Sequence, residues 1–173
     1  MALIVEDGSV VAGAESYCSV AFATTYHANR GNTAWAAIAT DTIREELLRK
    51  ATEYTIQKYR MRWSGFRLGS LQLLDWPRSY VPIPDVIQPG HGAYVSISII
   101  PEEVKNACAE LALRAIVGDL LGDLSQQKIH SEVGPIKVTY DKFSAQSIRY
   151  SAIDGMLSPY LKSGSNTVQT VRR

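Results

Sequence analysis

Two amphipathic helix patterns constrain the fold of this 173-residue chain more than any other feature. In the first, residues of one stripe recur every three or four positions, the spacing that puts side chains on one face of an α-helix. They are Ile43, Leu47, Ala51, Tyr54 and Lys58, widened by Leu48, Thr55 and Tyr59. Thr42 and Glu45 have the spacing of a capping box, so we expect a long helix over about residues 41–60.

The second pattern follows Pro101, a residue that suits the first position of a helix. Glu102 and Glu103 come next, where their charge favours the positive end of the helix dipole. The expected buried face is Val104, Ala107, Cys108, Leu111, Ala115 and Ile116. This predicts a second long helix from residue 101 to about 121, with Gly122 as its stop.

Shorter elements complete a mainly α fold. We expect a helix from Val20 to about Arg30, capped by Ser19 and stopped by Gly31, and a single helical turn around Trp35. A last helix, capped by Ser151, has an apolar face that comprises Ile153, Met156, Leu157, Tyr160 and Leu161.

Strands are expected only as short pieces. Leu3 to Val5 is compatible with a brief strand or a docked arm, Tyr94 to Ile99 with a strand, and residues 128–133 with 135–140 as a hairpin. The fold class is therefore a bundle of about four helices, two of them long, with a small β-hairpin or short strands. We expect one domain over residues 1–161 and a flexible polar tail over 162–173.

Charge balance excludes one class of DNA-binding protein. The chain has 18 basic and 17 acidic side chains, so its net charge of +1 cannot supply the broad positive field of a non-specific DNA binder. The amino terminus lacks a signal-peptide pattern and no apolar run is long enough to span a membrane, so we expect a soluble intracellular protein. Cys18 and Cys108 are too few for a disulfide framework or zinc site, and we expect small buried side chains without a redox role.

A search by residue type predicts no catalytic, cofactor or metal site. His27, His91 and His130 have no partner at metal-ligand spacing, and Asp119 with Asp123 is best interpreted as a solvated pair at a helix end. The phosphate-binding glycine loops and the nucleophile elbow of hydrolases are absent from the sequence.

One segment does have unusual chemistry. From Lys58 to Arg78 basic and aromatic residues alternate, and between Glu53 and Asp75 there is no acid. Such a segment can stack on and neutralise single-stranded DNA. It can also form a subunit interface, because Arg, Trp and Tyr dominate protein–protein contacts. A third interpretation is structural, with aromatic rings in the core and arginines on a wet face.

Several motifs occur in an order that resembles a known family. They are Ser16-Tyr17-x-Ser19, Tyr26-His27-x-x-Arg30-Gly31, Ala51-Thr52-x-Tyr54, Arg62-Trp63-x-Gly65, Gln72-x-x-x-Trp76-Pro77-Arg78, Ile100-Pro101-x-x-Val104-Lys105, and Val133-Gly134-Pro135-Ile136. Together they resemble the head-tail connector, or adaptor, proteins of tailed bacteriophages. The most similar group is often labelled DnaT-like single-stranded DNA-binding protein.

The resemblance implies a structural virion protein without enzymatic activity or cofactors. Its copies would form a ring, commonly of twelve, below the portal, extend the channel through which double-stranded DNA passes, and bind portal and tail or nozzle proteins. It would be found at the head-tail interface of the virion, and in the host cytoplasm during assembly, with no membrane partner. The alternative is a replication accessory that binds single-stranded DNA through Arg62, Trp63, Phe66 and Arg67.

Two sets of candidate contact residues follow. The candidates for a subunit interface or the channel are Arg60, Arg62, Trp63, Phe66, Arg67, Trp76 and Arg78. The candidates for portal docking lie in the tail and are Thr167, Val168, Val171, Arg172 and Arg173.

Overall fold

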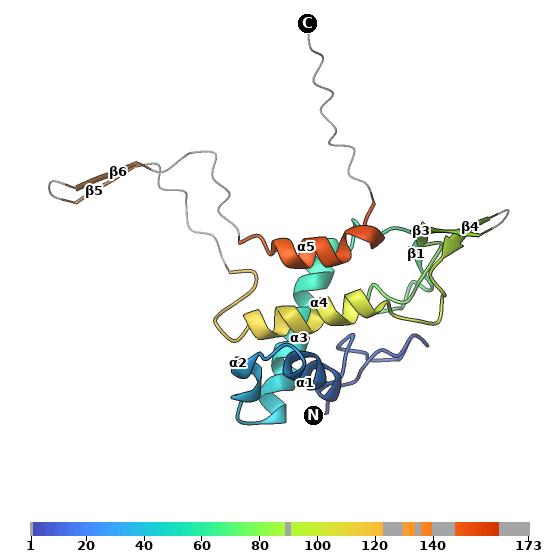
Figure 1. The fold of residues 1–173 in the computed structure, drawn as a ribbon, viewed down its shortest axis with the longest axis horizontal. Coiled ribbons are helices and arrows are strands. Elements are labelled where there is room, and N and C mark those ends of the chain that lie inside the picture. The colour runs from blue at the N-terminus through green and yellow to red at the C-terminus, as the bar shows by residue number, and fades with distance from the viewer. Residues whose placement is uncertain (1, 89–90, 123–129, 134–135, 140–147, 163–173) are drawn as a thin grey trace, which may run out of the picture.

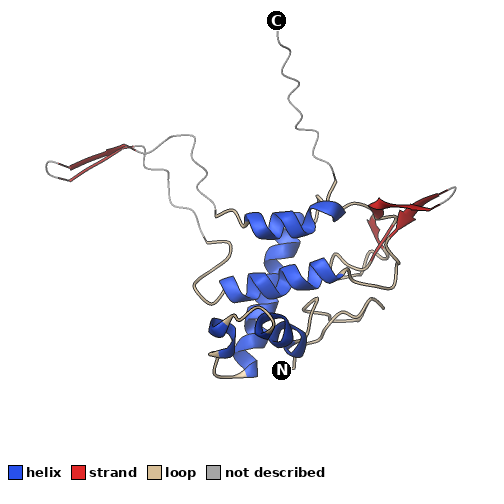
Figure 2. Ribbon diagram, viewed as in Figure 1, coloured by secondary structure: helices blue, strands red, loops and turns tan. Residues whose placement is uncertain are grey.

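The computed structural model describes residues 2–88, 91–122, 130–133, 136–139 and 148–162 (Figure 1). In these residues the helices are α1 (Val20–Ala28), α2 (Thr33–Ala36), α3 (Asp41–Tyr59), α4 (Glu102–Arg114), α5 (Ser151–Leu157) and the short 3-10 helix η1 (Ser158–Tyr160). The strands are β1 (Phe66–Arg67), β2 (Arg78–Ser79), β3 (Pro82–Gln88), β4 (His91–Tyr94), β5 (His130–Val133) and β6 (Ile136–Thr139). The predicted mainly α fold with small β elements is confirmed (Figure 2).

Helix α4 is the centre of the body. It packs against α3, which crosses it, against α5 on one side and against α1 on the other (Figure 1). Its buried positions are almost all small, with Ala107, Cys108, Ala109 and Ala112 each at most 1% exposed. Small side chains let neighbouring helix backbones approach closely, so three helices can share one central partner.

The start and end of α1 match the predicted signals. Ser19 precedes the helix, and its Oγ accepts the backbone N–H of Phe22 at 3.1 Å. Gly31 follows it with a φ of +67°, the left-handed geometry that glycine adopts at helix ends. In α2 the predicted turn is present, and the indole N–H of Trp35 donates to Thr24 Oγ1 of α1 at 3.1 Å.

The N-cap of α3 is Thr40, so the predicted cap at Thr42 is wrong. Thr40 Oγ1 accepts the N–H of Ile43 at 3.4 Å, while Thr42 lies inside the first turn. The expected buried face is confirmed from Leu47 onward. Ile43 is 42% exposed, because an apolar position is buried only where a neighbouring element covers it.

Helix α4 is shorter than predicted. It begins after Pro101 with Glu102 and Glu103 in its first turn, as expected. It ends at Arg114 instead of about residue 121, because the N–H groups of Ile116 and Val117 turn back to carbonyls three residues earlier. Ile116, expected on the buried face, is therefore 41% exposed.

Helix α5 begins at Ser151, but its N-cap residue is Tyr150, so the predicted cap at Ser151 is off by one residue. Ile153 and Leu157 are completely buried, as the predicted face required. Pro159 lies in the first turn of η1, where its missing N–H is tolerated.

The strands form three antiparallel pairs, β1 with β2, β3 with β4 and β5 with β6. The predicted strand over residues 94–99 is wrong, since β4 ends at Tyr94 and the chain then turns toward α4. The predicted hairpin is confirmed, with Val133 paired to Ile136 and His130 to Thr139.

The amino-terminal segment is a docked arm. Val5 makes a single bridge to Ser16, and the buried carboxylate of Glu6 accepts the N–H groups of Gly8, Val10 and Val11, each at 3.0 Å. One buried side chain therefore satisfies three backbone donors of this turn.

Other predictions have mixed outcomes. Cys18 and Cys108 are free and buried, as expected from their neighbours in the sequence. No helix of the described residues is long and apolar enough to cross a membrane. The division into a domain over 1–161 and a tail over 162–173 stays a prediction, and the five portal-docking candidates of the tail lie outside the described residues.

Candidate interaction surface

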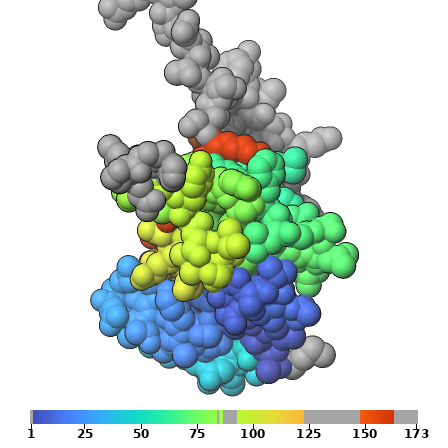
Figure 3. Space-filling view, turned by 90° about the vertical axis from the view of Figure 1, so that its right-hand side faces the viewer, coloured from blue at the N-terminus to red at the C-terminus, as the bar shows by residue number. Residues whose placement is uncertain are grey.

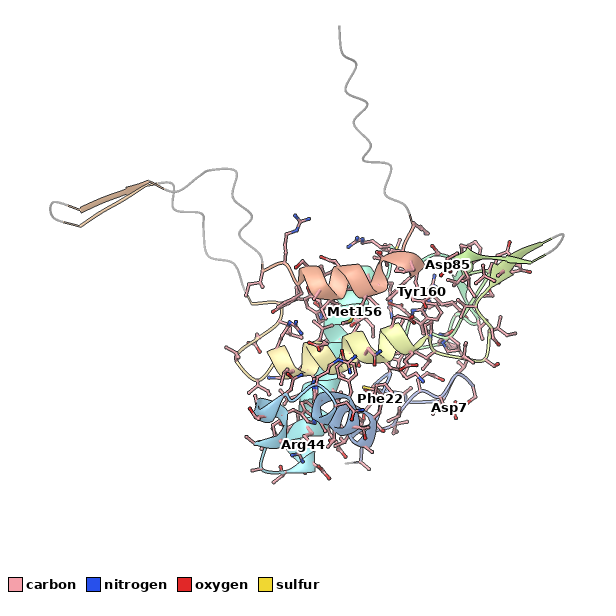
Figure 4. All side chains as sticks on the ribbon, viewed as in Figure 1. Asp7, Phe22, Arg44, Asp85, Met156 and Tyr160 are labelled. Carbon is pink, nitrogen blue, oxygen red and sulfur yellow. The ribbon has the colours of Figure 1, made fainter. Side chains whose placement is uncertain are left out.

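The two tryptophans of the basic and aromatic segment lie inside the protein. Trp63 and Trp76 are both 0% exposed, and their rings meet edge to face with centroids 5.6 Å apart. Tyr59 packs on Trp63, and Tyr160, labelled in Figure 4, packs on Trp76. Neither tryptophan can contact a base or a neighbouring subunit in this conformation, so their proposed role as contact residues is corrected to a role in the core.

Asp75 connects this aromatic cluster to the segment's positive charge. Its carboxylate is completely buried, and it accepts hydrogen bonds from Arg60 Nε at 2.8 Å and from the Trp63 indole N–H at 3.1 Å. The Asp75 backbone N–H donates to the Tyr17 hydroxyl at 3.0 Å. Burial raises the pKa of Tyr17, so this hydroxyl stays neutral. The charge of Arg60 is thus used to stabilise a buried carboxylate.

Arg78 holds two stretches of backbone together. Its guanidinium donates to the carbonyl oxygens of Ser64, Gly65 and Asp75 at 2.8, 2.8 and 3.1 Å. Burial lowers the pKa of Arg78, although it remains far above neutrality. Gly65 has a φ of +64°, and a Cβ there would collide with the carbonyl oxygen of Ser79, so only glycine fits.

Lys58 and Arg62 face Asp154 of α5. Lys58 Nζ lies 3.8 Å and Arg62 Nη1 4.0 Å from Asp154 Oδ1, while the Tyr59 hydroxyl donates to the same oxygen at 2.7 Å. Burial and this bond raise the pKa of Tyr59. Lys58 also donates to the Tyr54 hydroxyl at 2.7 Å. This half of the basic segment therefore joins the end of α3 to α5.

Gln72 fixes a projecting loop between β1 and β2. The side chain is 4% exposed, accepts the N–H of Leu68 at 2.9 Å and donates to the carbonyl of Pro77 at 2.9 Å. Arg67 donates to the Gln72 carbonyl at 2.7 Å. The loop is thus held from inside, and its backbone position does not depend on its outward-facing side chains.

The outward side chains of this region are apolar. We call the following set the apolar knob, with exposed fractions in parentheses: Met61 (84%), Phe66 (70%), Leu68 (40%), Leu71 (92%) and Leu73 (56%). Tyr80 and Tyr94 nearby are 70% and 57% exposed, and their rings meet edge to face. Figure 3 shows this end of the molecule, with the green part of the chain at its surface. Clustered exposed apolar side chains on a soluble protein indicate a binding surface.

A second apolar region follows the last turn of α4. Val117 is 93% exposed, Ile148 67%, Leu121 50% and Ile116 41%. A hollow of about 350 Å³ lies here, lined by Arg114, Val117, Gly118, Asp119, Ile148 and Tyr150. A neighbouring hollow of about 460 Å³ shares Arg114 and Val117 and extends to Asn32 and Ala34. We call these together the α4 hollow.

The predicted histidine and cysteine roles are structural where they can be described. His27 is completely buried, its Nε2 bonds the Ala109 carbonyl at 3.0 Å and its Nδ1 bonds the Asn32 amide at 3.0 Å. Thr52 Oγ1 lies 3.4 Å from Cys108 Sγ, and a hydrogen bond from Cys18 lowers the pKa of Cys108 to about 7. Asp119 is exposed and pairs with Lys50 at 3.7 Å, as a solvated residue, whereas Asp123 lies outside the described residues. Among the described residues no group of three histidine, cysteine or acidic side chains could hold a metal ion.

Of the predicted contact residues, the structure leaves Phe66 at the surface and Arg62 half exposed. Arg60, Arg67 and Arg78 are bound within the protomer, and Trp63 and Trp76 are in its core. Sequence reasoning missed Leu68, Leu71 and Leu73, and missed the α4 hollow. The signal for the knob was available as three leucines in six residues of a segment with no helical or strand pattern.

Comparison with known proteins gives one match. Neither the curated proteins nor the solved structures contain a match to this chain. A family model described as "Putative DnaT-like ssDNA binding protein" matches residues 1–173. The match spans the whole chain, and the protein belongs to this DnaT-like family.

Proposed function

We propose that this protein is a structural adaptor subunit that assembles with copies of itself and carries no catalytic activity. The observation that supports this most is where the structure places the side chains of residues 58–78. The tryptophans of this segment are buried, Arg60, Arg67 and Arg78 are hydrogen-bonded within the protomer, and the side chains of the apolar knob are exposed beside a half-exposed Arg62. A surface of this kind suits the core of a protein–protein interface, where charged residues are depleted.

The viral setting of the proposal comes from the motif resemblance. The protein would form a ring at the head-tail interface of a tailed bacteriophage, between portal and tail or nozzle proteins, with double-stranded DNA passing through the channel. The near-neutral net charge suits a channel through which DNA must slide without tight binding of its phosphates. The contacts of the motif Gln72-x-x-x-Trp76-Pro77-Arg78 support the same function. Gln72 and Arg78 bond backbone carbonyls of the segment that carries the knob, and Trp76 packs on Trp63 in the core.

Electron microscopy tests this proposal. The protein is imaged alone and after co-expression with the portal protein of the same genome. We expect ring-shaped particles, alone or on the portal. Single protomers in both preparations, with no portal bound, would contradict the proposed function.

Single-stranded DNA binding is the second candidate, and the family description favours it. The rings available for base stacking are Phe66, Tyr80 and Tyr94, which are exposed, and not Trp63. Arg62 and Arg60 are exposed cations of this segment, with side chains 52% and 40% accessible. Stacking of one base on one ring contributes about 1–3 kcal/mol.

Fluorescence anisotropy with a labelled oligothymidine at low and high salt tests this candidate. If it holds, binding is salt-dependent and weakens about 5- to 150-fold in Phe66→Ala or Tyr80→Ala, which is that stacking energy expressed as affinity. Ile43→Ala is the matched control, since Ile43 is an exposed apolar residue on another element. Equal, weak binding of all four proteins would remove this candidate.

A further inference from the structure

We propose that copies of this protein join head to tail, with the apolar knob of one copy seated in the α4 hollow of the next. This inference rests on the proposed self-assembly and names the two surfaces that would carry it.

The knob has the properties of an inserting element. Leu71 is 92% exposed at the tip of its loop, next to Gln72, which is 4% exposed. The Gln72 side chain bonds the backbone of Leu68 and of Pro77, and the Arg67 side chain bonds the backbone carbonyl of Gln72. These hydrogen bonds fix the loop. A rigid loop loses little conformational entropy on binding, so its exposed leucines can contribute most of their burial energy.

The α4 hollow has the properties of a receiving site. Val117 lies in both of its parts, which together provide concave space on either side of an almost completely exposed apolar side chain. Ile148 and Ile116 add apolar surface at its edges. A concave apolar site and a convex apolar loop are complementary in shape.

The two surfaces lie at opposite ends of α4. At its first turn, Glu103 accepts a hydrogen bond from Tyr160, whose ring packs on Trp76 beneath the knob. At the other end, Arg114 lines the hollow. A helix of 13 residues is about 20 Å long, so a knob held in place by Gln72 cannot reach the hollow of its own chain. Figure 1 shows the same separation, with β1 at one end of α4 and the last turn of α4 at the other.

Charge also favours this pairing. The chain from Tyr54 to Leu74 contains no acid, and Arg62 near the knob is half exposed. At the rim of the hollow the Asp119 side chain is 76% exposed, and its ion pair with Lys50 is long at 3.7 Å. Asp119 can therefore face a basic neighbour, whereas two knobs facing each other would bring like charges together.

A contact between two different surfaces leaves each copy with one free knob and one free hollow. Such a contact continues until a ring closes, or produces a filament if the rotation does not close. A knob-to-knob contact would stop at a dimer. The arrangement therefore predicts how variants of the two surfaces behave when they are mixed.

Size-exclusion chromatography with multi-angle light scattering of Leu71→Glu and Val117→Glu, separately and mixed, tests the inference. Each variant lacks one surface, so each alone should stay at the monomer mass of 19.1 kDa. The mixture retains one intact knob and one intact hollow and should form a dimer of twice that mass. Ile43→Glu, which alters an exposed apolar residue elsewhere, should assemble like the wild type.

The outcomes separate this inference from the proposed function. If wild type and both variants assemble equally, the two surfaces are wrong while self-assembly stands. If only Leu71→Glu blocks assembly, the contact is knob to knob. If the wild type never assembles, with or without portal, the proposed function fails as well.

Cross-linking gives a second readout that does not depend on loss of assembly. Leu71→Cys and Val117→Cys are mixed under mild oxidation, and a disulfide-linked dimer is expected only in the mixture. The native cysteines are buried, which limits background. A dimer formed equally by Leu71→Cys alone would overturn the head-to-tail arrangement.

Discussion

Asp75 binds one of the cations of residues 58–78, Arg60, inside the protomer. A carboxylate with no solvent access needs a cation and hydrogen-bond donors, and Arg60 and Trp63 provide them. The same carboxylate fixes the position of Trp63, which in turn packs on Trp76. One acidic residue thus holds both a cation and a tryptophan of this segment inside the protomer.

Trp63→Ala should destabilise the protein by about 3–5 kcal/mol, because it empties a core site and removes the donor to Oδ2 of the buried Asp75, which keeps only its bond from Arg60. Phe66→Ala, on an exposed side chain, should change the unfolding free energy by no more than about 0.5 kcal/mol. Urea unfolding followed by circular dichroism measures both. Equal, small effects would mean that Trp63 is not a core residue.

His27 predicts a pH dependence of stability. Burial lowers the pKa of His27 below its usual 6.5, and the Ala109 carbonyl and Asn32 satisfy the neutral ring. The unfolded chain then binds a proton more readily than the folded one, so stability is full above about pH 6.5 and falls as pH drops toward the lowered pKa.

Urea unfolding of the wild type and His27→Gln between about pH 8 and about pH 5.5 checks this. The other titrating groups near His27 are Glu110, Arg30 and Arg114, and they are the same in both proteins. The wild type should lose more stability than the variant over this range. Parallel pH profiles would contradict a neutral buried His27.

Which residue caps α3 is testable by comparing two threonines. Thr40→Ala should cost about 1 kcal/mol, because Thr40 Oγ1 accepts the Ile43 N–H. Thr42→Ala serves as the control and should be close to neutral or slightly stabilising, since alanine favours helix interiors. The unfolding midpoint in urea measures the effect of both substitutions. A larger loss of stability for Thr42→Ala than for Thr40→Ala would mean that Thr42, and not Thr40, caps the helix.

Helices were predictable where one apolar face runs against one partner. The start of α1 followed from its cap, the extent of α3 from its periodicity, and the β5–β6 hairpin from alternation. The end of α4 was not predictable, because Ile116 and Val117 continue the apolar pattern although they are 41% and 93% exposed. Their exposure became visible only with the neighbouring elements in place.

The candidate surface was less predictable than the fold. Composition identified residues 58–78 as unusual, and it left open three uses of the same arginines and rings. Tertiary contacts from Asp154, 76 positions beyond Arg78 in the chain, and from Tyr17 determine which of these side chains are bonded within the protomer. Such long-range pairs leave no local signal in a single sequence.

At the level of the whole molecule, the near balance of charge has a structural explanation. Some acids and bases are paired inside the protomer, as in Arg60 with Asp75 and Lys58 with Asp154. Two exposed apolar regions at opposite ends of α4 suit a chain of identical contacts better than a single dimer.

Sedimentation velocity of the wild-type protein mixed with a fluorescently labelled single-stranded oligonucleotide tests this account most directly, because it reports self-association and DNA binding together. Protein absorbance follows the first and the label follows the second. The account predicts that the protein sediments as a large closed assembly while the label remains with free DNA. Protein that stays monomeric and carries the label with it would contradict the account and establish the DNA-binding alternative.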